Sequence, residues 1–317
     1  MKKKITIVGG GNGTAIGICA LKKFNDRYDL SAVVSVVDSG GSTGRLRQEF
    51  GVLPPGDLMR GVLAMSSHDY HTLRQIFYKN RFKDTGKLDK HNLGNLFLTL
   101  SAQYAGDFLA ALRALSQAVQ ACGPVYPVSL DNLTLCVRLT DGTVVKTEAL
   151  IDEPRYDRSL KIKEAWLEPA GKVYEPAARV LGRADYIVFV LGSLYTSVIP
   201  NLLVGGVKEV LSRSTAKIVT VVGNAYEARG ETGPTTLSGM ITHLERYLPR
   251  PIDVIVCNNA KLNQQQKSRY QEKNWALFDQ DVDMIQAQRS CVQDNFEKDE
   301  GGLDAGKLGT VLAKIIV

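Results

Sequence analysis

Blocks of apolar residues alternate with amphipathic blocks along the chain, and this alternation predicts strands joined by helices. The apolar blocks are short, rich in β-branched residues and bounded by glycine or polar residues, which is typical of strands buried on both faces. They are Ile5–Val8, Ala32–Val37, Tyr186–Leu191, Lys217–Val222 and Ile252–Cys257. Because helical spacing of apolar residues lies between them, the pattern predicts an α/β fold of the Rossmann-like, doubly wound type, with a mainly parallel sheet and helices on both faces.

Residues 125–170 have a different character and predict a small antiparallel β appendage. Short strands are expected at Leu133–Leu139, Thr143–Thr147 and Ile162–Leu167, and Asp141-Gly142 between the first two is a hairpin-turn signal. The alternation of strands and helices resumes after this stretch. We therefore expect a single Rossmann-like domain over residues 1–317, with the β-rich appendage within it.

Four segments are assigned from composition alone. Residues 48–60 carry two prolines and a glycine, which favours irregular structure followed by a short helix that Asp57 would cap. The uncharged helix from His91 to Tyr104 is expected to lie buried against the sheet. The polar run Gln264–Lys267 is expected to be a loop, and the segment 304–316 a closing helix or strand.

The composition is that of a globular protein, with 44% hydrophobic and 23% charged residues in 317. A net charge of +6 suits anionic small molecules, and basic runs with interleaved aromatics are missing, so no nucleic-acid partner is expected. No apolar run approaches the ~20 residues that span a membrane, and the lysines at 2–4 precede too few apolar residues for a secretion signal. Five cysteines without CxxC spacing fit a reduced cytoplasm, so we expect a cytoplasmic protein; homo-oligomerisation is left open.

The segment Gly9–Thr14 follows the first strand at once and opens a helix. Glycine allows positive φ and close backbone approach, and the free N–H groups and dipole at the start of a helix attract phosphate. The Rossmann fingerprint is incomplete, because Thr14 stands where its third glycine belongs. The segment predicts a phosphate-binding turn; the alternative is a tight strand-to-helix turn without a ligand.

Other predicted strands also end in small or polar residues. Asp38 ends the second strand, and Gly192-Ser193, Asn224 and Asn258 follow three later strands. In a parallel sheet all carboxyl ends share one edge, and ligands bind there at the point where the strand order reverses. We therefore expect two glycine turns, one from each half of the chain, to lie side by side and to hold an anionic diphosphate.

Several candidates have a structural alternative. The polar side chains at 91–95 either face a ligand or satisfy buried backbone groups, and Arg45, expected on a loop, either pairs with phosphate or is solvated. The hydroxyls and N–H groups of 192–201 bind phosphate or sugar oxygens, or cap the next helix. Segment 230–233 is a lid or an ordinary polar loop. The candidate ligand-binding residues are Gly10, Gly11, Asn12, Gly13, Thr14, Asp38, Ser39, Gly40, Gly41, Ser42, Arg45, Asp57, His91, Asn92, Asn95, Gly192, Ser193, Tyr195, Thr196 and Asn224.

No catalytic constellation is readable from the sequence. A Ser-His-Asp arrangement, a G-x-S-x-G elbow and a Walker A loop are all missing. The four histidines lack metal-ligand spacing with cysteines or carboxylates. Catalytic residues are therefore left unassigned, and no metal ligand is nominated.

Five motifs occur in an order that resembles the bacterial gluconeogenesis factor family, a sister of 2-phospho-L-lactate transferase, the enzyme of coenzyme F420 synthesis. The resemblance spans nearly the whole chain, and the five motifs are Gly9–Gly13, Asp38–Arg47, Leu53–Asp57, His91–Leu96 and Gly192–Ser197. The resemblance implies a Rossmann-like fold that binds a UDP-sugar, typically UDP-N-acetylglucosamine. It also implies a regulatory role that supports cell shape and wall synthesis during growth on gluconeogenic carbon, with no catalytic activity established.

The chain departs from the family pattern in three places. Val190-Leu191 replaces Gly-Pro, Ser39 replaces a second aspartate, and Leu58–Arg60 replaces Ile-Arg-Asn. The alternative function is that of a transferase like the sister enzyme. Such an enzyme would need a divalent metal, and Asp38 with Asp57 is the only pair of carboxylates that we would assign to it. A nicotinamide-dependent oxidoreductase is disfavoured by the incomplete fingerprint and by the lack of a proton donor.

Overall fold

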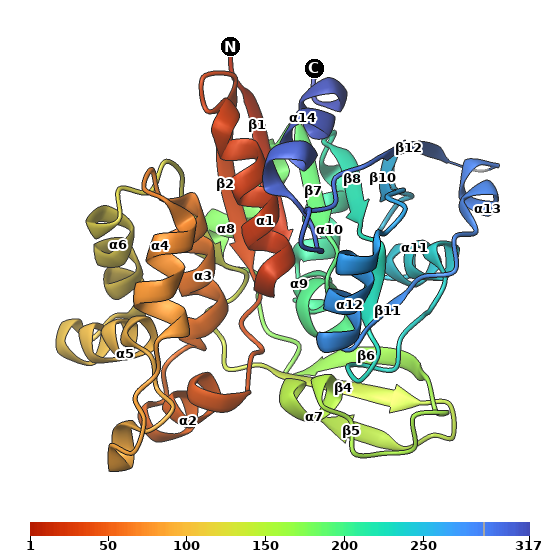
Figure 1. Ribbon diagram of the computed structural model, residues 1–317. Helices are drawn as coiled ribbons and strands as arrows, with labels where there is room; N and C mark the ends of the chain where they lie inside the picture. Colours follow the sequence, from red (N-terminus) through yellow and green to blue (C-terminus); the bar gives the residue numbers. More distant parts are fainter. Residues whose placement is uncertain (288) are drawn as a thin grey trace.

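A seven-stranded parallel sheet forms the centre of the protein (Figure 1), and the computed structural model describes residues 1–287 and 289–317. Within those residues the strand order is β12-β10-β8-β7-β1-β2-β3, and every neighbouring pair is parallel. The strands are β1 (Lys3–Gly9), β2 (Tyr28–Val34), β3 (Val125–Pro127), β7 (Tyr186–Val190), β8 (Lys217–Val222), β10 (Val254–Asn258) and β12 (Ser290–Asp294). The fold is thus the α/β, Rossmann-like class that the sequence predicts.

The strand order reverses between β1 and β7. The chain builds outward from β1 through β2 to β3 on one side, and then from β7 through β8 and β10 to β12 on the other. In register, Val8 lies opposite Val33 on one side and Phe189 on the other, and the side chains of these three residues are at most 2% exposed. The switch point therefore lies where the segments following β1 and β7 leave the sheet.

Helices cover both faces of this sheet. α1 packs with α3 and α14 on one face, and α8 packs with α10 on the other (Figure 1). The helices are α1 (Gly11–Leu21), α2 (Gly41–Phe50), α3 (Pro55–Met65), α4 (Tyr70–Arg74), α5 (Leu93–Ala105), α6 (Phe108–Ala118), α7 (Glu148–Asp152), α8 (Glu175–Arg183), α9 (Ile199–Leu203), α10 (Val207–Arg213), α11 (Leu237–Glu245), α12 (Gln264–Glu272), α13 (Val282–Gln286) and α14 (Ala305–Ile315). π-helical turns extend α4 over Gln75–Lys79 and precede α9 over Leu194–Val198.

Two small antiparallel sheets complete the strands of the described chain. β4 (Thr134–Leu139) lies between β5 (Val144–Lys146) and β6 (Ile162–Glu168), and this sheet is the expected appendage. β9 (Ala225–Glu227) pairs with β11 (Trp275–Leu277). Because β3 joins the central sheet, the appendage sheet itself begins at Thr134, after the start of the 125–170 segment.

Two predictions around the second strand were wrong. Gly41–Phe50 is a helix rather than a loop, so Arg45 lies on α2, and β2 ends at Val34, short of Val37. α3 begins at Pro55. Proline is tolerated at this position because the first N–H groups of a helix have no intrahelical partner. Asp57 therefore lies inside the first turn of α3 and is not its cap.

Two further predictions failed because helical signals were weighed wrongly. Gln264–Glu272 is helix α12, begun by a capping box in which Asn263 and Gln266 bond each other's backbone N–H. α5 packs on α3 and α6 rather than on the sheet, and it leaves Leu100 and Tyr104 60% and 96% exposed. No described helix combines the length and the apolar character that crossing a bilayer requires.

Candidate functional site

The two glycine turns touch at the switch point. A Cβ on Gly13 would lie 2.3 Å from the carbonyl oxygen of Val190 and 3.4 Å from the backbone nitrogen of Gly192. At Gly11, where φ is +61°, a Cβ would lie 3.4 Å from Ser197 Oγ. The two turns approach this closely only because glycine at positions 11 and 13 has no side chain. They lie side by side, as the sequence predicts.

The N-terminus of α1 is open to a ligand. Gly10 precedes the helix in an extended conformation, and no described side chain caps it. Asn12 in the first turn is exposed, whereas Thr14 is buried and its hydroxyl donates to the Gly10 carbonyl at 3.1 Å. The free N–H groups and the helix dipole therefore make this end of α1 a site for an anion.

The second βα turn places another helix N-terminus next to the start of α3. Gly40 precedes α2 without a side-chain cap from the described residues, and Gly41 is exposed with φ +44°. The Gly40 N–H donates to Asp38 Oδ1 at 2.9 Å. A Cβ on Gly56 would lie 2.9 Å from Asp38 Oδ2, so glycine lets α3 approach this carboxylate. Asp38 therefore sits between the start of α2 and the start of α3.

Four carboxylates line the site, and two of them come from the appendage. Asp57 lies against the first turn, because a Cβ on Gly10 would be 2.6 Å from its Oδ2. Burial and the neighbouring Asp57 raise the pKa of Asp38 to about 6, and burial and Asp38 raise the pKa of Glu148 to about 8. Burial also raises the pKa of Asp152. Crowded carboxylates resist ionisation together, so this wall holds protons near neutral pH unless a cation joins it.

The departure at Ser39 ties the appendage to the glycine turn. The Ser39 hydroxyl accepts the Ala149 N–H at 3.0 Å, and the Ser39 N–H donates to Glu148 Oε2 at 3.1 Å. These two bonds place the start of α7 beside α2. Ser39 is thus occupied by a contact within the chain, and Glu148 lies next to the position where the family pattern has a second aspartate.

The buried cluster of Asn92, Asn95 and His91 holds the start of α2. Ser42 Oγ lies 2.8 Å from His91 Nδ1 and accepts Asn95 Nδ2 at 3.0 Å. Asn92 Oδ1 accepts the Asn95 N–H at 2.8 Å and so caps α5. Burial and Arg45 lower the pKa of His91. These bonds fit the structural alternative, whereas Asn92 Nδ2 and Asn95 Oδ1 are buried without a hydrogen-bond partner among the described residues.

Arg45 lies on the outside of α2. Its guanidinium is exposed and donates to the carbonyl oxygen of Asp89. A different arginine reaches the first glycine turn: Arg60 Nη1 is 3.4 Å from the Cβ position of Gly11 and 3.7 Å from Asp57 Oδ1. Arg60 belongs to the triplet after Asp57 that departs from the family pattern, and it is not among the candidates predicted from the sequence.

The second glycine turn already holds an anion of the chain itself. The carboxylate of Glu231 accepts the N–H of Tyr195 at 3.1 and 3.0 Å and that of Thr196 at 3.0 Å. It also accepts the N–H of Leu194 at 2.5 Å. Burial raises the pKa of Glu231 to about 7, against the lowering effect of the bond from Tyr195. The segment 230–233, expected as a lid or a loop, thus fills the cradle beside Ser193, which is half-buried, and Gly192, which is exposed.

The other candidates of the second half also have partners inside the protein. Tyr195 is buried, and its hydroxyl lies 2.6 Å from His243 Nδ1. Thr196 Oγ1 donates to Asp152 Oδ1 at 3.3 Å, which connects this turn with the appendage. Asn224 is buried at the end of β8, where its amide donates to Glu297 Oε2 at 3.2 Å.

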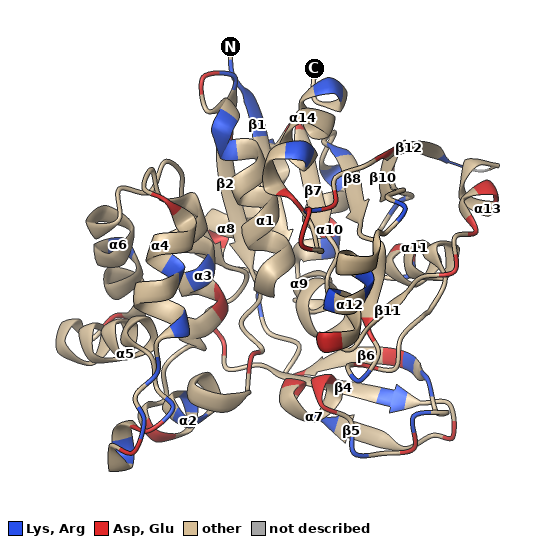
Figure 2. Ribbon diagram, viewed as in Figure 1, with Lys and Arg blue, Asp and Glu red and all other residues tan. Residues whose placement is uncertain are grey.

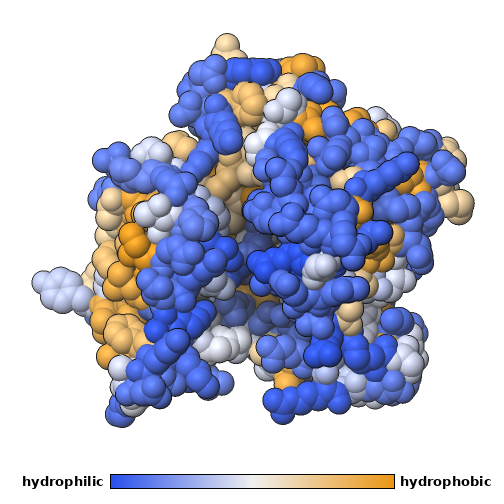
Figure 3. Space-filling view, viewed as in Figure 1, coloured by the Kyte–Doolittle hydropathy of each residue, from blue (hydrophilic) through white to orange (hydrophobic). Residues whose placement is uncertain are grey.

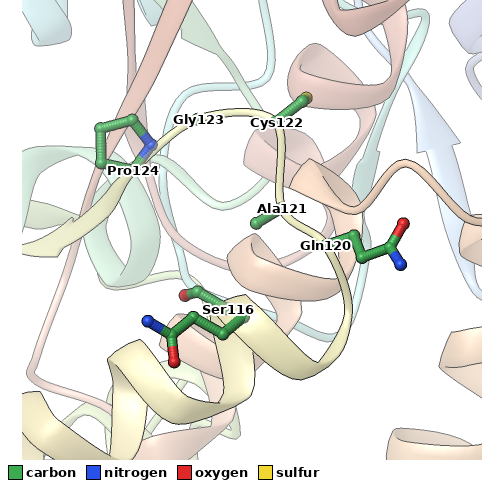
Figure 4. A pocket seen from close by; sticks show the side chains of 7 residues that line it. Ser116, Gln120, Ala121, Cys122, Gly123 and Pro124 are labelled. Atoms are coloured by element: carbon green, nitrogen blue, oxygen red, sulfur yellow. The ribbon is translucent and has the colours of Figure 1, made fainter.

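A hollow opens in front of α1, between α3 and α4 on one side and α12 on the other, with the appendage below (Figures 1 and 3). A separate recess of about 400 Å³ lies around Ser116–Pro124, at the end of α6 (Figure 4). Gly123 in that recess packs against the carbonyl oxygen of Leu30, in the first half of β2. The recess thus lies away from the carboxyl edge and has no charged lining residue.

No group of three or more histidine, cysteine or acidic residues in the described chain is arranged to hold a metal ion. Asp38 and Asp57 remain a pair of adjacent carboxylates. Mg²⁺ is commonly bound by one or two carboxylates together with phosphate oxygens of a ligand and water. The pair therefore fits a divalent ion only in the company of a phosphorylated ligand.

Three acidic residues of the site were missed from the sequence. Glu148 and Asp152 lie four apart in the segment after the hairpin, and that helical spacing was their only local signal. Glu231 lay in a segment that was singled out, but nothing local indicates that it reaches Tyr195.

Comparison with known proteins places this geometry in a family. Residues 5–296 match the family model described as 2-phospho-L-lactate transferase CofD. The gluconeogenesis factor of Bacillus subtilis is 34% identical over 290 residues, 90% of this chain and 88% of that protein. The gluconeogenesis factor of Halalkalibacterium halodurans is 35% identical over 274 residues, covering 85% and 81%.

A solved structure agrees with the fold. The crystal structure of a UPF0052 family member from Bacillus halodurans superposes with a TM-score of 0.89 at 31% identity, over 99% of both chains. The sequence matches and this superposition cover nearly the whole chain, from the first glycine turn to the last strand of the sheet. The chain therefore belongs to the CofD family, together with the proteins named gluconeogenesis factor.

Proposed function

We propose that the hollow at the switch point binds a nucleotide-sugar of the UDP-N-acetylglucosamine kind, with the diphosphate at the N-termini of α1 and α2. The observation that supports this most is the contact of the two glycine turns, where Gly13 approaches Val190 and Gly192. α1 starts at this contact, at Gly11, and α2 starts at Gly41, next to Asp38; neither helix N-terminus has a side-chain cap from the described residues. Backbone N–H groups and helix dipoles together favour a diphosphate.

The carboxylates suit the rest of such a ligand. Asp38 offers acceptor oxygens to ribose or sugar hydroxyls, and Glu148, which keeps a proton near neutral pH, offers both a donor and an acceptor. As a ligand-dependent regulatory protein, the chain would link carbon metabolism to cell-wall synthesis and cell shape. The names of its relatives support the link with carbon metabolism, and the sequence resemblance suggests the link with cell-wall synthesis and cell shape.

A thermal-shift panel tests the ligand. We expect saturable stabilisation by UDP-N-acetylglucosamine, about 2.7 kcal/mol at a hundredfold excess over Kd, and little from GDP, GTP or NAD. UDP-glucose in the same panel tests whether the protein distinguishes N-acetylglucosamine from glucose. Stabilisation by guanine nucleotides alone, or by NAD alone, would exclude the proposed ligand.

One variant separates ligand binding from folding. Asn12→Asp adds a carboxylate to the exposed first turn of α1, where the dipole favours it by ~0.3–1 kcal/mol. The free protein should therefore keep or gain stability, while the negative charge repels the diphosphate and reduces the ligand-induced shift. Asn25→Asp, an exposed change of the same kind beyond the C-terminal end of α1, is the matched control and should leave the ligand shift unchanged.

A second candidate function is group transfer from a nucleotide-activated donor, as the name of the matching family model suggests. The adjacent carboxylates of Asp38 and Asp57 favour it, because they would hold a divalent ion that draws electrons from a donor phosphate. In this case Mg²⁺ should increase the stabilisation by GDP or GTP, and Asp57→Asn should cancel the increase. A shift that is indifferent to Mg²⁺ in both proteins would exclude this candidate.

A further inference from the structure

An arginine cluster lies on the wall of the hollow formed by α3 and α4. Three guanidinium groups surround the ring of Tyr78, with their carbons 4.5 Å (Arg60), 5.8 Å (Arg74) and 5.6 Å (Arg81) from its centroid. Figure 2 shows basic residues on α3 and α4 and, lower in the view, acidic residues on α7. Because α3 carries Asp57 as well as Arg60, this wall of the hollow holds charges of both signs.

The positive charge of this cluster is only partly balanced. Asp57 is the ion-pair partner of Arg60, at 3.7 Å, and the Arg60 side chain is 12% exposed. The described residues contribute no ion pair to Arg74 or Arg81. Guanidinium groups so close together repel one another, and an anion between them relieves the repulsion.

Two arginine N–H donors of this cluster without hydrogen-bond partners also indicate an anion site. The Nε atoms of Arg60 and Arg74 are both buried, and neither has a hydrogen-bond partner among the residues described. Buried donors without an acceptor are uncommon in folded proteins, because each costs about 1–3 kcal/mol. Arg60 Nη2 donates to the hydroxyl of Tyr78 at 2.5 Å, so the ring fixes the guanidinium while Nε remains unused.

Arg60 connects the cluster with the glycine turn, since its Nη1 is 3.4 Å from the Cβ position of Gly11. We propose that Arg60 and Arg74, ordered by Tyr78, form a subsite for a phosphoryl group that also contacts the N-terminus of α1. A phosphoryl group fits because its three oxygens serve backbone N–H groups and a guanidinium fork at once, and its charge matches two arginines. The inference rests on the proposed diphosphate site and extends it: the subsite accepts phosphoryl groups without a base or a sugar.

Inorganic diphosphate is the probe, because it carries no nucleoside. Its affinity for the full-length protein is measured by calorimetry at low salt, beside that of UDP-N-acetylglucosamine. Arg74→Gln should weaken diphosphate binding about tenfold or more, the loss expected when a charged hydrogen bond is removed. Arg81→Gln is the matched control: it removes the same charge beside the same ring, but Arg81 is exposed and donates to the Lys90 carbonyl at 2.7 Å. It should change affinity less than about twofold.

The outcomes separate the subsite from the proposed function. Equal effects of the two variants, or no effect of either, would overturn the subsite. Diphosphate binding that depends on Arg74, in a protein that ignores UDP-N-acetylglucosamine, would support the subsite and reject the nucleotide-sugar. Should Arg74→Gln not fold, Arg74→Lys keeps charge and bulk but lacks the fork, and an unchanged affinity in that variant would also overturn the proposal.

Discussion

The carboxylate of Glu231 holds the backbone N–H of Tyr195 through both of its oxygens, at 3.1 and 3.0 Å. The N–H groups of Leu194 and Thr196 on either side donate to the same carboxylate. Consecutive N–H groups aimed at one anion are the arrangement expected of a phosphate-binding turn. At the second glycine turn the protein thus supplies from within the negative charge that the sequence predicts for a ligand.

Removal of that carboxylate should destabilise the protein and open the cradle. Glu231→Ala leaves three N–H groups without their acceptor, so we expect a loss of ~3 kcal/mol in urea unfolding, at about 1 kcal/mol for each bond. Glu231→Gln keeps an oxygen at the same place and should lose less. Inorganic phosphate, compared with sodium chloride at equal ionic strength, should raise the Tm of Glu231→Ala more than that of the wild type. Equal stabilisation of both proteins would show that the cradle takes no phosphate.

The raised pKa of Glu148 gives a pH dependence with a definite sign. Burial first, and then Asp38, raise this pKa from 4.5 to about 8. The folded protein therefore binds the proton more tightly than the unfolded chain, and stability falls as pH rises from about 4.5 to 8. Glu148→Gln should be more stable than the wild type by ~1–2 kcal/mol at about pH 8 and should flatten the slope. Glu153→Gln, an exposed change just past α7, is the control. If it changed the pH dependence of stability as much as Glu148→Gln does, the slope could not be assigned to Glu148.

The contact between the two glycine turns predicts a sharp difference between two alanine variants. Gly13→Ala places a methyl group 2.3 Å from the Val190 carbonyl oxygen. Alanine is favoured over glycine in a helix by about 1 kcal/mol, but overpacking against the backbone should cost ~3 kcal/mol or more. The variant should therefore be less stable than the wild type. At Gly192 a Cβ meets open space, so Gly192→Ala should stay within about 0.5 kcal/mol of the wild type. Thermal unfolding of the two variants compares them directly.

We expect the Asn224 side chain to stabilise the ligand-free protein rather than to bind a ligand. Its amide and that of Asn258 donate to Glu297 Oε2, and the Tyr270 hydroxyl donates to Oε1 at 2.8 Å. Asn224→Ala should therefore lower the stability of the ligand-free protein by ~1–2 kcal/mol. Glu297→Ala removes the shared acceptor of all these donors and should cost more, about 3 kcal/mol or above. An Asn224→Ala protein with an unchanged Tm but weaker ligand binding would mean that the side chain serves the sugar instead.

Local sequence signals predicted five strands of the central sheet but missed β3, β12 and some helices. The runs at Ile5–Val8 and Lys217–Val222 predicted strands correctly, because β-branched apolar residues bounded by glycine suit a sheet buried on both faces. α2 was missed because its glycines and polar residues favour a loop. Its start is held by Ser42 against His91 and Asn95, residues about fifty positions away. α12 had a local signal, the capping box of Asn263, that the polar composition concealed.

Part of the site was predictable for the same reason. The turns at Gly10 and Gly192 and the acid at Asp38 follow strands, and all strands of a parallel sheet end at one edge. Glu148 reaches that edge on the appendage, and Arg60 reaches it from the second turn of α3. Their approach depends on how α3 and α7 pack, which the spacing of residues along the chain does not express.

The sequence by itself determined the parallel sheet, the reversal of strand order and the meeting of two glycine turns, because these follow from local periodicity and from the geometry of βα units. Tertiary structure alone decided which anion each turn receives. Glu231 is brought to the second turn from 36 residues away, whereas Asp57 and Arg60 lie against the first turn and no hydrogen bond from a described side chain caps α1. Long-range packing sets these distances, and over a few ångströms the distance decides whether a carboxylate fills a cradle or leaves it open.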